Sequence, residues 1–219
     1  MASGTAAGFG LLGERSWPVR ITALLVGLVL FGVSSGLMIV SGLGNMPWDV
    51  LHQGIAAHTP LSTGQAAIGL SVLVLLLWIP LRQRIGPGTV ANAVVVGVVI
   101  DATTSVVRRP GPLWADLTMV LGAVVLNGFA TVLYISPALG PGPRDGLMTG
   151  LVARTGKPVA LLRSGIEVVV MAAGWALGGR LFIATFVYAF GIGPVTRLFL
   201  GLAARVLSPS SSLSPHSTD

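Results

Sequence analysis

Two aspartates stand at matching positions in two copies of one short motif. Asp49 and Asp145 each lie two residues after a proline. Proline is favoured at the first position of a helix, so each aspartate falls in a first turn, where its carboxylate complements the positive end of the helix dipole. Membrane carriers hold ions and anionic groups at such helix ends, whereas elsewhere an aspartate only caps an interfacial helix, and both interpretations are open here. The residues that break the chain at the two motifs are Gly44, Pro47, Gly54, Gly140, Pro143 and Gly150.

A second group of candidates consists of charged residues inside apolar segments. Arg163 and Glu167 are four residues apart, so on a helix they share one face and can pair. Burying either one alone in lipid is costly, so we expect the pair to face the interior of the bundle or water. There Glu167 could take up a proton or Arg163 an anionic solute, and a structural ion pair is the alternative. Asp101 is a further candidate for binding substrate or ion, and Arg197 is its possible partner.

Several other kinds of chemistry are excluded. The chain contains no cysteine, which removes disulfides, thiol nucleophiles and Cys-ligated metals. His52 and His58 are six residues apart, a poor spacing for one helical face, and no third metal ligand is near them. The sequence offers no convergent nucleophile and base. We therefore expect no catalytic residues, no metal site, no cofactor and no enzymatic activity.

The composition places these residues in a membrane. Of 219 residues, 53% are hydrophobic and only 9% are charged, with a mean hydropathy of +0.87. Soluble domains are about 25% charged. The net charge of +6 comes from basic residues scattered between apolar runs, a pattern that suits membrane loops better than a nucleic-acid surface. We expect the lipid bilayer as a partner and no nucleic acid.

Six segments are long and apolar enough to cross a hydrocarbon core of about 30 Å as helices. They are residues 21–43, 64–81, 88–107, 113–136, 159–177 and 181–204. The sequence thus predicts an all-α, polytopic membrane helix bundle of about six transmembrane helices. Because the third and fifth segments carry charged residues, five crossings are the alternative count.

The basic residues of the loops orient the chain. With Arg163 set aside, nine Lys and Arg residues lie on the N-terminal side of the six crossings and three on the opposite side. Positively charged loops remain cytoplasmic. We expect a multi-pass protein of the bacterial plasma (inner) membrane with both termini in the cytoplasm.

The chain is also a duplicated unit. Residues 21–107 align without gaps to residues 117–203 at an offset of 96, with 24 identities in 87 positions, where the composition alone would give about 8. The expected organisation is an N-terminal cytoplasmic segment (1–20), two membrane repeats (21–107 and 117–203) joined by a linker (108–116), and a disordered cytoplasmic tail (204–219).

Each repeat holds three long helices, an odd number, so the second repeat enters the membrane from the opposite side. This inverted-topology plan requires that the motif segments, residues 45–59 and 144–157, do not cross. The first reaches only about 22 Å as a helix, and the second carries four charged residues. We therefore expect each to form a short broken or re-entrant helix, with an interfacial helix as the alternative.

The motifs resemble a known family. Gly-Leu-Gly-x-x-Pro-x-Asp-x-Leu at residues 42–51 and Leu-Gly-x-x-Pro-x-Asp-x-Leu at residues 139–147 are similar to those of the bacterial YczE/YyaS/YitT-like integral membrane proteins. Arg154-Thr155-Gly156 and the Arg163 and Glu167 pair also resemble that group, and the similarity extends over residues 20–202. The resemblance implies a duplicated membrane protein and does not imply a substrate.

Two functions follow from these features. An inverted repeat is the plan of many secondary transporters, which predicts a small transporter or exporter with a cavity between the repeats, taking a small-molecule substrate and a coupling proton or sodium ion. The alternative is a non-transporting membrane protein that stabilises or regulates a partner complex. The Gly-x-x-x-Gly pairs at residues 32–36 and 174–178 allow close helix contacts, either within one chain or in a homodimer.

Overall fold

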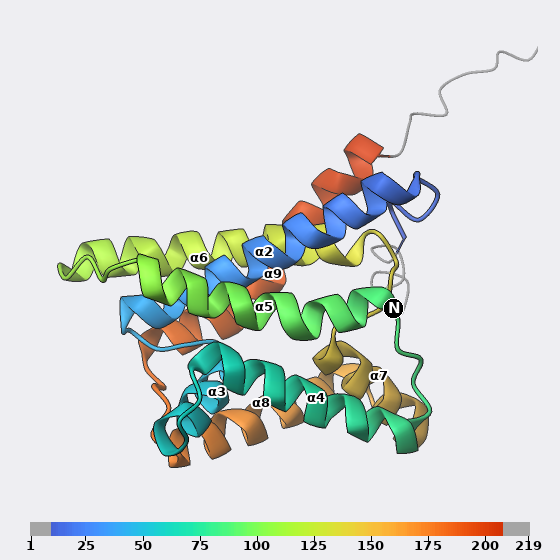
Figure 1. Ribbon diagram of the computed structural model, residues 1–219. Coiled ribbons are helices and arrows are strands. Elements are labelled where there is room, and N and C mark those ends of the chain that lie inside the picture. The colour runs from blue at the N-terminus through green and yellow to red at the C-terminus, as the bar shows by residue number, and fades with distance from the viewer. Residues whose placement is uncertain (1–9, 208–219) are drawn as a thin grey trace, which may run out of the picture.

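All regular structure in residues 10–207, the part of the chain that the computed structural model describes, is helical (Figure 1). The helices are α2 (Trp17–Ser41), α3 (Pro47–His58), α4 (Thr63–Leu81), α5 (Pro87–Val106), α6 (Leu113–Ile135), α7 (Pro143–Thr155), α8 (Val159–Ala176) and α9 (Ile183–Leu207). The prediction of an all-α bundle is confirmed.

Six of the helices are long and apolar enough to cross a membrane, as the sequence predicts. They coincide with the six expected segments apart from shifts of a few residues at their ends. The largest shift is at α2, which begins at Trp17, so the expected N-terminal segment ends in helix. Helix α9 continues to Leu207, so the expected disordered tail begins in helix. The rest of that tail and residues 1–9 of the expected N-terminal segment lie outside the described residues.

The two motif segments form the short helices α3 and α7. With 12 and 13 residues they are about 18–20 Å long, too short to cross the hydrocarbon core. A proline starts each one, because the missing proline N–H would have no partner at a helix start. The first turn of α3, Pro47–Val50, is buried among the other helices, which disfavours an interfacial helix.

The duplication is visible in the helix boundaries. The starts of α2 and α6, α3 and α7, α4 and α8, and α5 and α9 are all separated by the same offset of 96 residues found in the sequence. Each repeat thus contains a long helix, a short helix and two more long helices.

The two repeats exchange equivalent contacts. The Ala184 N–H donates to the Leu43 carbonyl at 2.9 Å, and the Gly88 N–H donates to the Leu139 carbonyl at 2.8 Å. Both residues of the first bond are offset by 96 from those of the second. Reciprocal contacts of this kind indicate that an approximate twofold axis relates the two repeats. The inverted orientation of the repeats in the membrane stays a prediction, and these contacts support it.

Glycines allow the same exchange at the helix breaks. Gly44 has a φ of 111° and lies against Thr185, while its counterpart Gly140 has a φ of 119° and lies against Thr89. A Cβ would lie 2.9 Å from the Thr185 hydroxyl in the first case and 2.7 Å from the Thr89 hydroxyl in the second. Both the left-handed backbone and the close approach therefore require glycine.

The helices form two layers (Figure 1). α2, α5, α6 and α9 lie together, and α3, α4, α7 and α8 make up the other layer. Gly32 and Gly36 of α2 pack against Val99 and Thr103 of α5, so this glycine pair serves contacts within the chain. Between the repeats, α3 packs on α8 and α4 packs on α7.

The repeats differ in how well their third helix is covered. α4 packs on α5 and buries Trp78, whose ring fills the space beside Gly146 of α7. In the other repeat, Gly174 replaces the tryptophan, and the backbone of α8 approaches α3 directly at Leu51. Gly174 is the one buried residue of α8, and within residues 10–207 this helix makes no packing on α9 comparable to that of α4 on α5. One long face of α8 is therefore open.

Candidate functional site

The N-terminal ends of α3 and α7 meet in the bundle. The guanidinium of Arg144, in the first turn of α7, lies over the ring of Trp48, in the first turn of α3, with 4.9 Å between the Arg144 Cζ and the ring centroid. Arg144 Nη2 is also 3.9 Å from Asp49 Oδ1. The first turn of α3 and the arginine side chain from α7 therefore place positive charge beside one buried carboxylate.

Asp49 is the most enclosed of the charged residues at this junction. Its side chain is fully buried, and Oδ1 lies 3.0 Å from His52 Nδ1 on the same helix. With the proton on Nδ1, the imidazole donates this hydrogen bond. The other oxygen, Oδ2, has no hydrogen-bond partner among the described residues. A buried carboxylate oxygen without a partner is costly, so it marks a place where a ligand could bind.

The surroundings of Asp49 favour its charged form. Burial would raise the pKa of Asp49, but the hydrogen bond from His52 and the positive charge of Arg144 oppose burial and lower the pKa below its usual value. Burial also lowers the pKa of His52, and the nearby carboxylate only partly opposes it. At neutral pH the junction thus holds an ionised Asp49 beside a neutral imidazole.

Asp145 occupies the equivalent position in α7 but has different neighbours. Its Oδ2 accepts a hydrogen bond of 3.0 Å from the Tyr134 hydroxyl. A Cβ on Gly142 would lie 3.3 Å from the same Oδ2 and 3.2 Å from the Asn92 amide nitrogen, so this amide also faces the site. Asp145 is half-buried, in contrast to Asp49. The repeats therefore place two carboxylates at one junction in unequal surroundings.

A buried amide network extends the polar surface toward the layer of α2, α6 and α9. The Tyr188 hydroxyl donates to Asn127 Oδ1 at 3.1 Å, and Asn127 Nδ2 donates to the Ser34 hydroxyl at 2.7 Å. Ser35 donates to the Met46 sulfur at 3.4 Å. Tyr188 lies close enough to Asp49 and Arg144 for their charges to act on its hydroxyl. The network therefore borders the junction of the short helices.

Arg163 and Glu167 pair as the spacing predicts, with Nε 3.2 Å from Oε1. Their side chains are 58% and 35% exposed, so the pair lies on the open part of α8 and not in a closed interior. The charges of Arg163 and Glu167 nevertheless reach the Tyr188 hydroxyl. The negative charge of Asp145 likewise acts on the Arg163 guanidinium. The pair thus stands at the edge of the polar junction.

Asp101 lies apart from this group. It accepts hydrogen bonds from the Ser62 hydroxyl and, at 2.8 Å, from the Gly64 N–H, both at the start of α4. No ion pair between Asp101 and Arg197 forms within residues 10–207. These contacts describe an aspartate that holds the start of α4 against α5.

The helix-break residues supply the framework and no binding side chains. Pro143 presents its carbonyl to the Trp78 Nε1–H at 3.0 Å, and Pro47 starts the helix that carries Asp49. Gly54 lies against the backbone of Gly174, and Gly150 lies against Leu81. The two glycines allow α3 to pack closely on α8 and α7 to pack closely on α4.

Sequence reasoning missed several members of the junction. The spacing of His52 and His58 argues against a metal site, but the position of His52 three residues after Asp49 on one helix is the signal that predicts their pairing. Arg144 was counted among the cytoplasmic loop charges, whereas it lies at the junction with a side chain only 30% exposed. Removing it from the nine leaves eight basic residues against three, so the expected orientation is unchanged. Tyr134 and Tyr188 carried no local signal.

Comparisons with known proteins agree with this architecture. The model of a family of unknown function, DUF6198, matches residues 18–201. An uncharacterised protein of Haemophilus influenzae is 39% identical over 186 residues, covering 85% of each chain. The uncharacterised membrane protein YczE of Bacillus subtilis is 31% identical over 196 residues, covering 87% of this chain and 89% of its own. No solved structure matches.

These matches confirm the resemblance to YczE-like membrane proteins. The family match spans both repeats and the helix-break motifs. The chain is an integral membrane protein that belongs to the DUF6198 family.

Proposed function

We propose that this protein is a small secondary transporter whose coupling ion or solute binds at the junction of α3 and α7. One observation carries the proposal: Asp49 is fully buried, lies within 3.9 Å of Arg144 and has one carboxylate oxygen without a partner among the described residues. In the described part of the chain, Asp116 Oδ1 is likewise buried without a partner, but Asp116 pairs with Arg109 at the start of α6, whereas Asp49 lies where side chains of the two short helices meet. A sodium ion or a donor group of the solute would satisfy Oδ2.

The neighbouring charges fit a solute site. Asp145, Arg163 and Glu167 are more exposed than Asp49 and lie near the same junction, so they can meet a solute before it reaches the buried carboxylate. Discontinuous helices that point their ends at a central site are a recurring device of secondary transporters. The asymmetry between the surroundings of Asp49 and Asp145 suits two ligands with different roles, a solute and a coupling ion.

The reciprocal contacts between the repeats supply a means of alternating access. In an inverted repeat, the two halves can exchange conformations by rocking about the central site. Gly44 and Gly140, at equivalent helix breaks, are the positions where the backbone can absorb such a change. The proposal includes the orientation expected from the basic residues, with both termini on the cytoplasmic side of the bacterial plasma membrane.

The first test is a ligand screen with a matched variant. The full-length protein in detergent is heated with amino acids, organic acids, sugars, nucleosides, polyamines, and sodium or choline chloride. A ligand at 100 times its dissociation constant stabilises the folded protein by about 2.7 kcal/mol. We expect at least one class to raise the melting temperature of the wild type and of Glu14→Gln, an exposed control, but not of Asp49→Asn.

Flux measurement then decides between binding and transport. Proteoliposomes loaded with the ligand found in the screen should show counterflow that Asp49→Asn abolishes. A ligand response that Asp49→Asn retains in full would contradict the proposed site. Binding without any counterflow would contradict transport.

A second function is favoured by the open face of α8. Arg163 and Glu167, in the first half of the apolar helix α8, have side chains that are 58% and 35% exposed, and charged groups that face lipid are costly. A helix from a partner protein or from a second copy would cover them. This observation supports the alternative, a non-transporting membrane protein that stabilises or regulates a partner complex.

Cross-linking separates the alternative from a carrier that works alone. Val168 on α8 and Val72 on α4 are equivalent by the offset of 96, and both are exposed. Because the chain has no cysteine, Val168→Cys and Val72→Cys form a matched pair of single-cysteine variants. If α8 is a partner surface, Val168→Cys alone should cross-link to one stoichiometric membrane protein. A product of twice the chain mass would instead identify a homodimer, and no product from either variant would count against the partner-binding function.

A further inference from the structure

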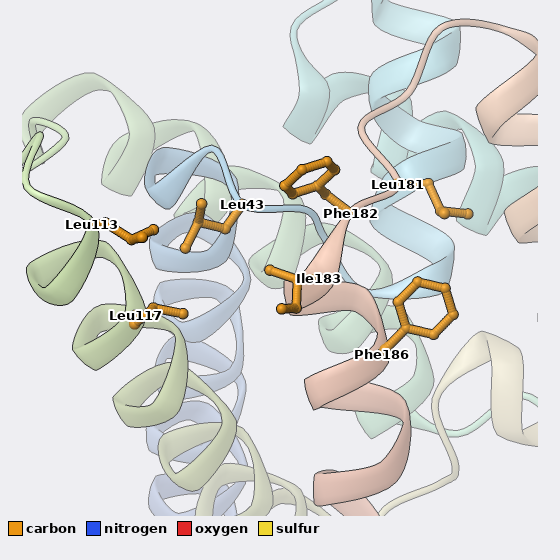
Figure 2. A pocket seen from close by; sticks show the side chains of 7 residues that line it. All are labelled: Leu43, Leu113, Leu117, Leu181, Phe182, Ile183 and Phe186. Atoms are coloured by element: carbon orange, nitrogen blue, oxygen red, sulfur yellow. The ribbon is translucent and has the colours of Figure 1, made fainter.

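An apolar groove of about 580 Å³ opens on the outside of the bundle between the first turns of α6 and α9. Its walls are apolar side chains from three segments: Leu43 after α2, Leu113 and Leu117 of α6, and Phe182, Ile183 and Phe186 at α9. Figure 2 shows Leu113 and Leu117 on one side of the groove and Ile183 and Phe186 on the other. A groove of this size and lining suits hydrocarbon chains and not a polar solute.

Two guanidinium groups converge at one end of the groove. A Cβ on Gly42, the residue before Leu43, would lie 3.4 Å from Nη1 of both Arg109 and Arg180. The two like charges therefore flank the same point, and both belong to exposed residues. Each arginine comes from a loop that leads into a groove wall.

The local carboxylate does not neutralise both charges. Asp116 accepts from Nε and Nη2 of Arg109, at 2.9 and 2.7 Å, and both bonds use the same oxygen, Oδ2. This leaves Nη1 of Arg109 beside Gly42. Within residues 10–207, Arg180 has no ion pair. The two arginines and Asp116 together carry one net positive charge, which stays available to an anion. Each guanidinium has five N–H donors in a planar fork that matches a phosphate.

The position of the pair matches the level of lipid headgroups. The loops after α2, α5 and α8, which carry Gly42, Arg109 and Arg180, lie on one side of the membrane if the six long helices alternate in direction. Trp114, exposed in the first turn of α6, marks the same end as the membrane–water boundary, where tryptophan is enriched. A basic site at this level with an apolar groove below it has the two parts that a phospholipid requires.

We propose that the groove between α6 and α9 binds one anionic phospholipid, with its phosphate between Arg109 and Arg180 and an acyl chain along Leu117 and Phe186. Charge complementarity selects an anionic headgroup, and the apolar walls select a lipid over a free phosphate ester. The first repeat has Gly13 and Arg84 where the second has Arg109 and Arg180, so the lipid site belongs to one repeat only.

Native mass spectrometry of the full-length protein in detergent tests the site. The protein is titrated with dioleoyl phosphatidylglycerol or dioleoyl phosphatidylcholine. The matched variants are Arg180→Gln and Arg84→Gln, its repeat counterpart, which is also exposed. An arginine near a headgroup contributes on the order of 1 kcal/mol, so Arg180→Gln should weaken phosphatidylglycerol binding about fivefold or more. Arg84→Gln should leave it within about twofold of the wild type.

Three results would overturn the proposal. Equal affinity of the wild type for the two lipids would remove the headgroup contact. An equal loss in Arg84→Gln and Arg180→Gln would show only a general effect of net charge. Displacement of bound phosphatidylglycerol by glycerol phosphate at the same concentration would show an anion site without a contribution from the groove.

Discussion

Trp48 and Arg144 occupy equivalent positions in the two repeats and contact one another, with the guanidinium carbon 4.9 Å from the ring centroid. Equivalent residues of a twofold arrangement can touch only near the axis that relates them. The contact therefore locates that axis at the ends of α3 and α7. The duplication placed two identical aspartates beside it, and later divergence gave one an arginine and a histidine as neighbours.

The pairing of Asp49 with Arg144 predicts a non-additive response to mutation. Arg144→Met should destabilise the protein by about 1–3 kcal/mol, because it leaves a buried carboxylate without its counter-charge. Asp49→Asn together with Arg144→Met should cost less than the sum of the two single changes. Thermal unfolding of the four proteins in detergent measures this coupling. Strict additivity would mean that the 3.9 Å approach contributes no interaction.

The buried imidazole predicts acid sensitivity. In the folded protein the pKa of His52 lies below its usual value of 6.5, which the unfolded chain retains. At a pH between the folded and the unfolded pKa, the unfolded chain binds more protons than the folded protein, so acid favours unfolding. The stabilising contribution is therefore complete above about pH 6.5 and is lost as the pH falls toward the lowered folded pKa. Asp49, whose folded pKa is also lowered, adds a similar loss only below its usual value of 3.8.

Melting temperatures measured from pH 7.5 to 4.5 check this expectation. The wild type and His58→Gln should lose stability as the pH falls below about 6.5, whereas His52→Gln should show a shallower dependence. Parallel curves for all three proteins would indicate that His52 does not titrate differently in the folded and unfolded states.

The contact of Gly146 with Trp78 predicts a packing defect. A Cβ on Gly146 would overlap the indole ring, so Gly146→Ala should destabilise the fold by about 1–3 kcal/mol. Gly69→Ala is the control, because a Cβ there has no neighbour within 4 Å and alanine favours helix. Unfolding midpoints in one detergent compare the two. Equal stability of both variants would show that the ring moves aside without cost.

The separation of Asp101 from the junction predicts a structural effect without a functional one. Asp101→Asn should cost about 1–2 kcal/mol, because the amide accepts less strongly than a carboxylate from Ser62 and Gly64. It should leave the response to any ligand found in the screen unchanged. Loss of that response, at a temperature where the variant is folded, would return Asp101 to the binding site.

The sequence by itself determined the membrane class, the six long helices, the two short ones and the duplication. These properties depend on residues close together in the chain: apolar runs set the long helices, and the prolines at 47 and 143 set the starts of the short ones. The offset of 96 residues that relates identical residues in the two repeats also separates the starts of equivalent helices. The reason is that both repeats carry the same local signals for helix formation.

Only the tertiary structure decided which charged groups meet. Asp49 and Arg144 are 95 residues apart, and their contact depends on how the repeats pack across their axis. Packing also brought Asp101 of α5 against the start of α4 and left Arg163 on the open face of α8. In the sequence the two residues look alike, because both are charges within apolar segments. Hydropathy and spacing report the environment along one helix, whereas the partners of a buried charge come from other helices whose approach no local pattern encodes.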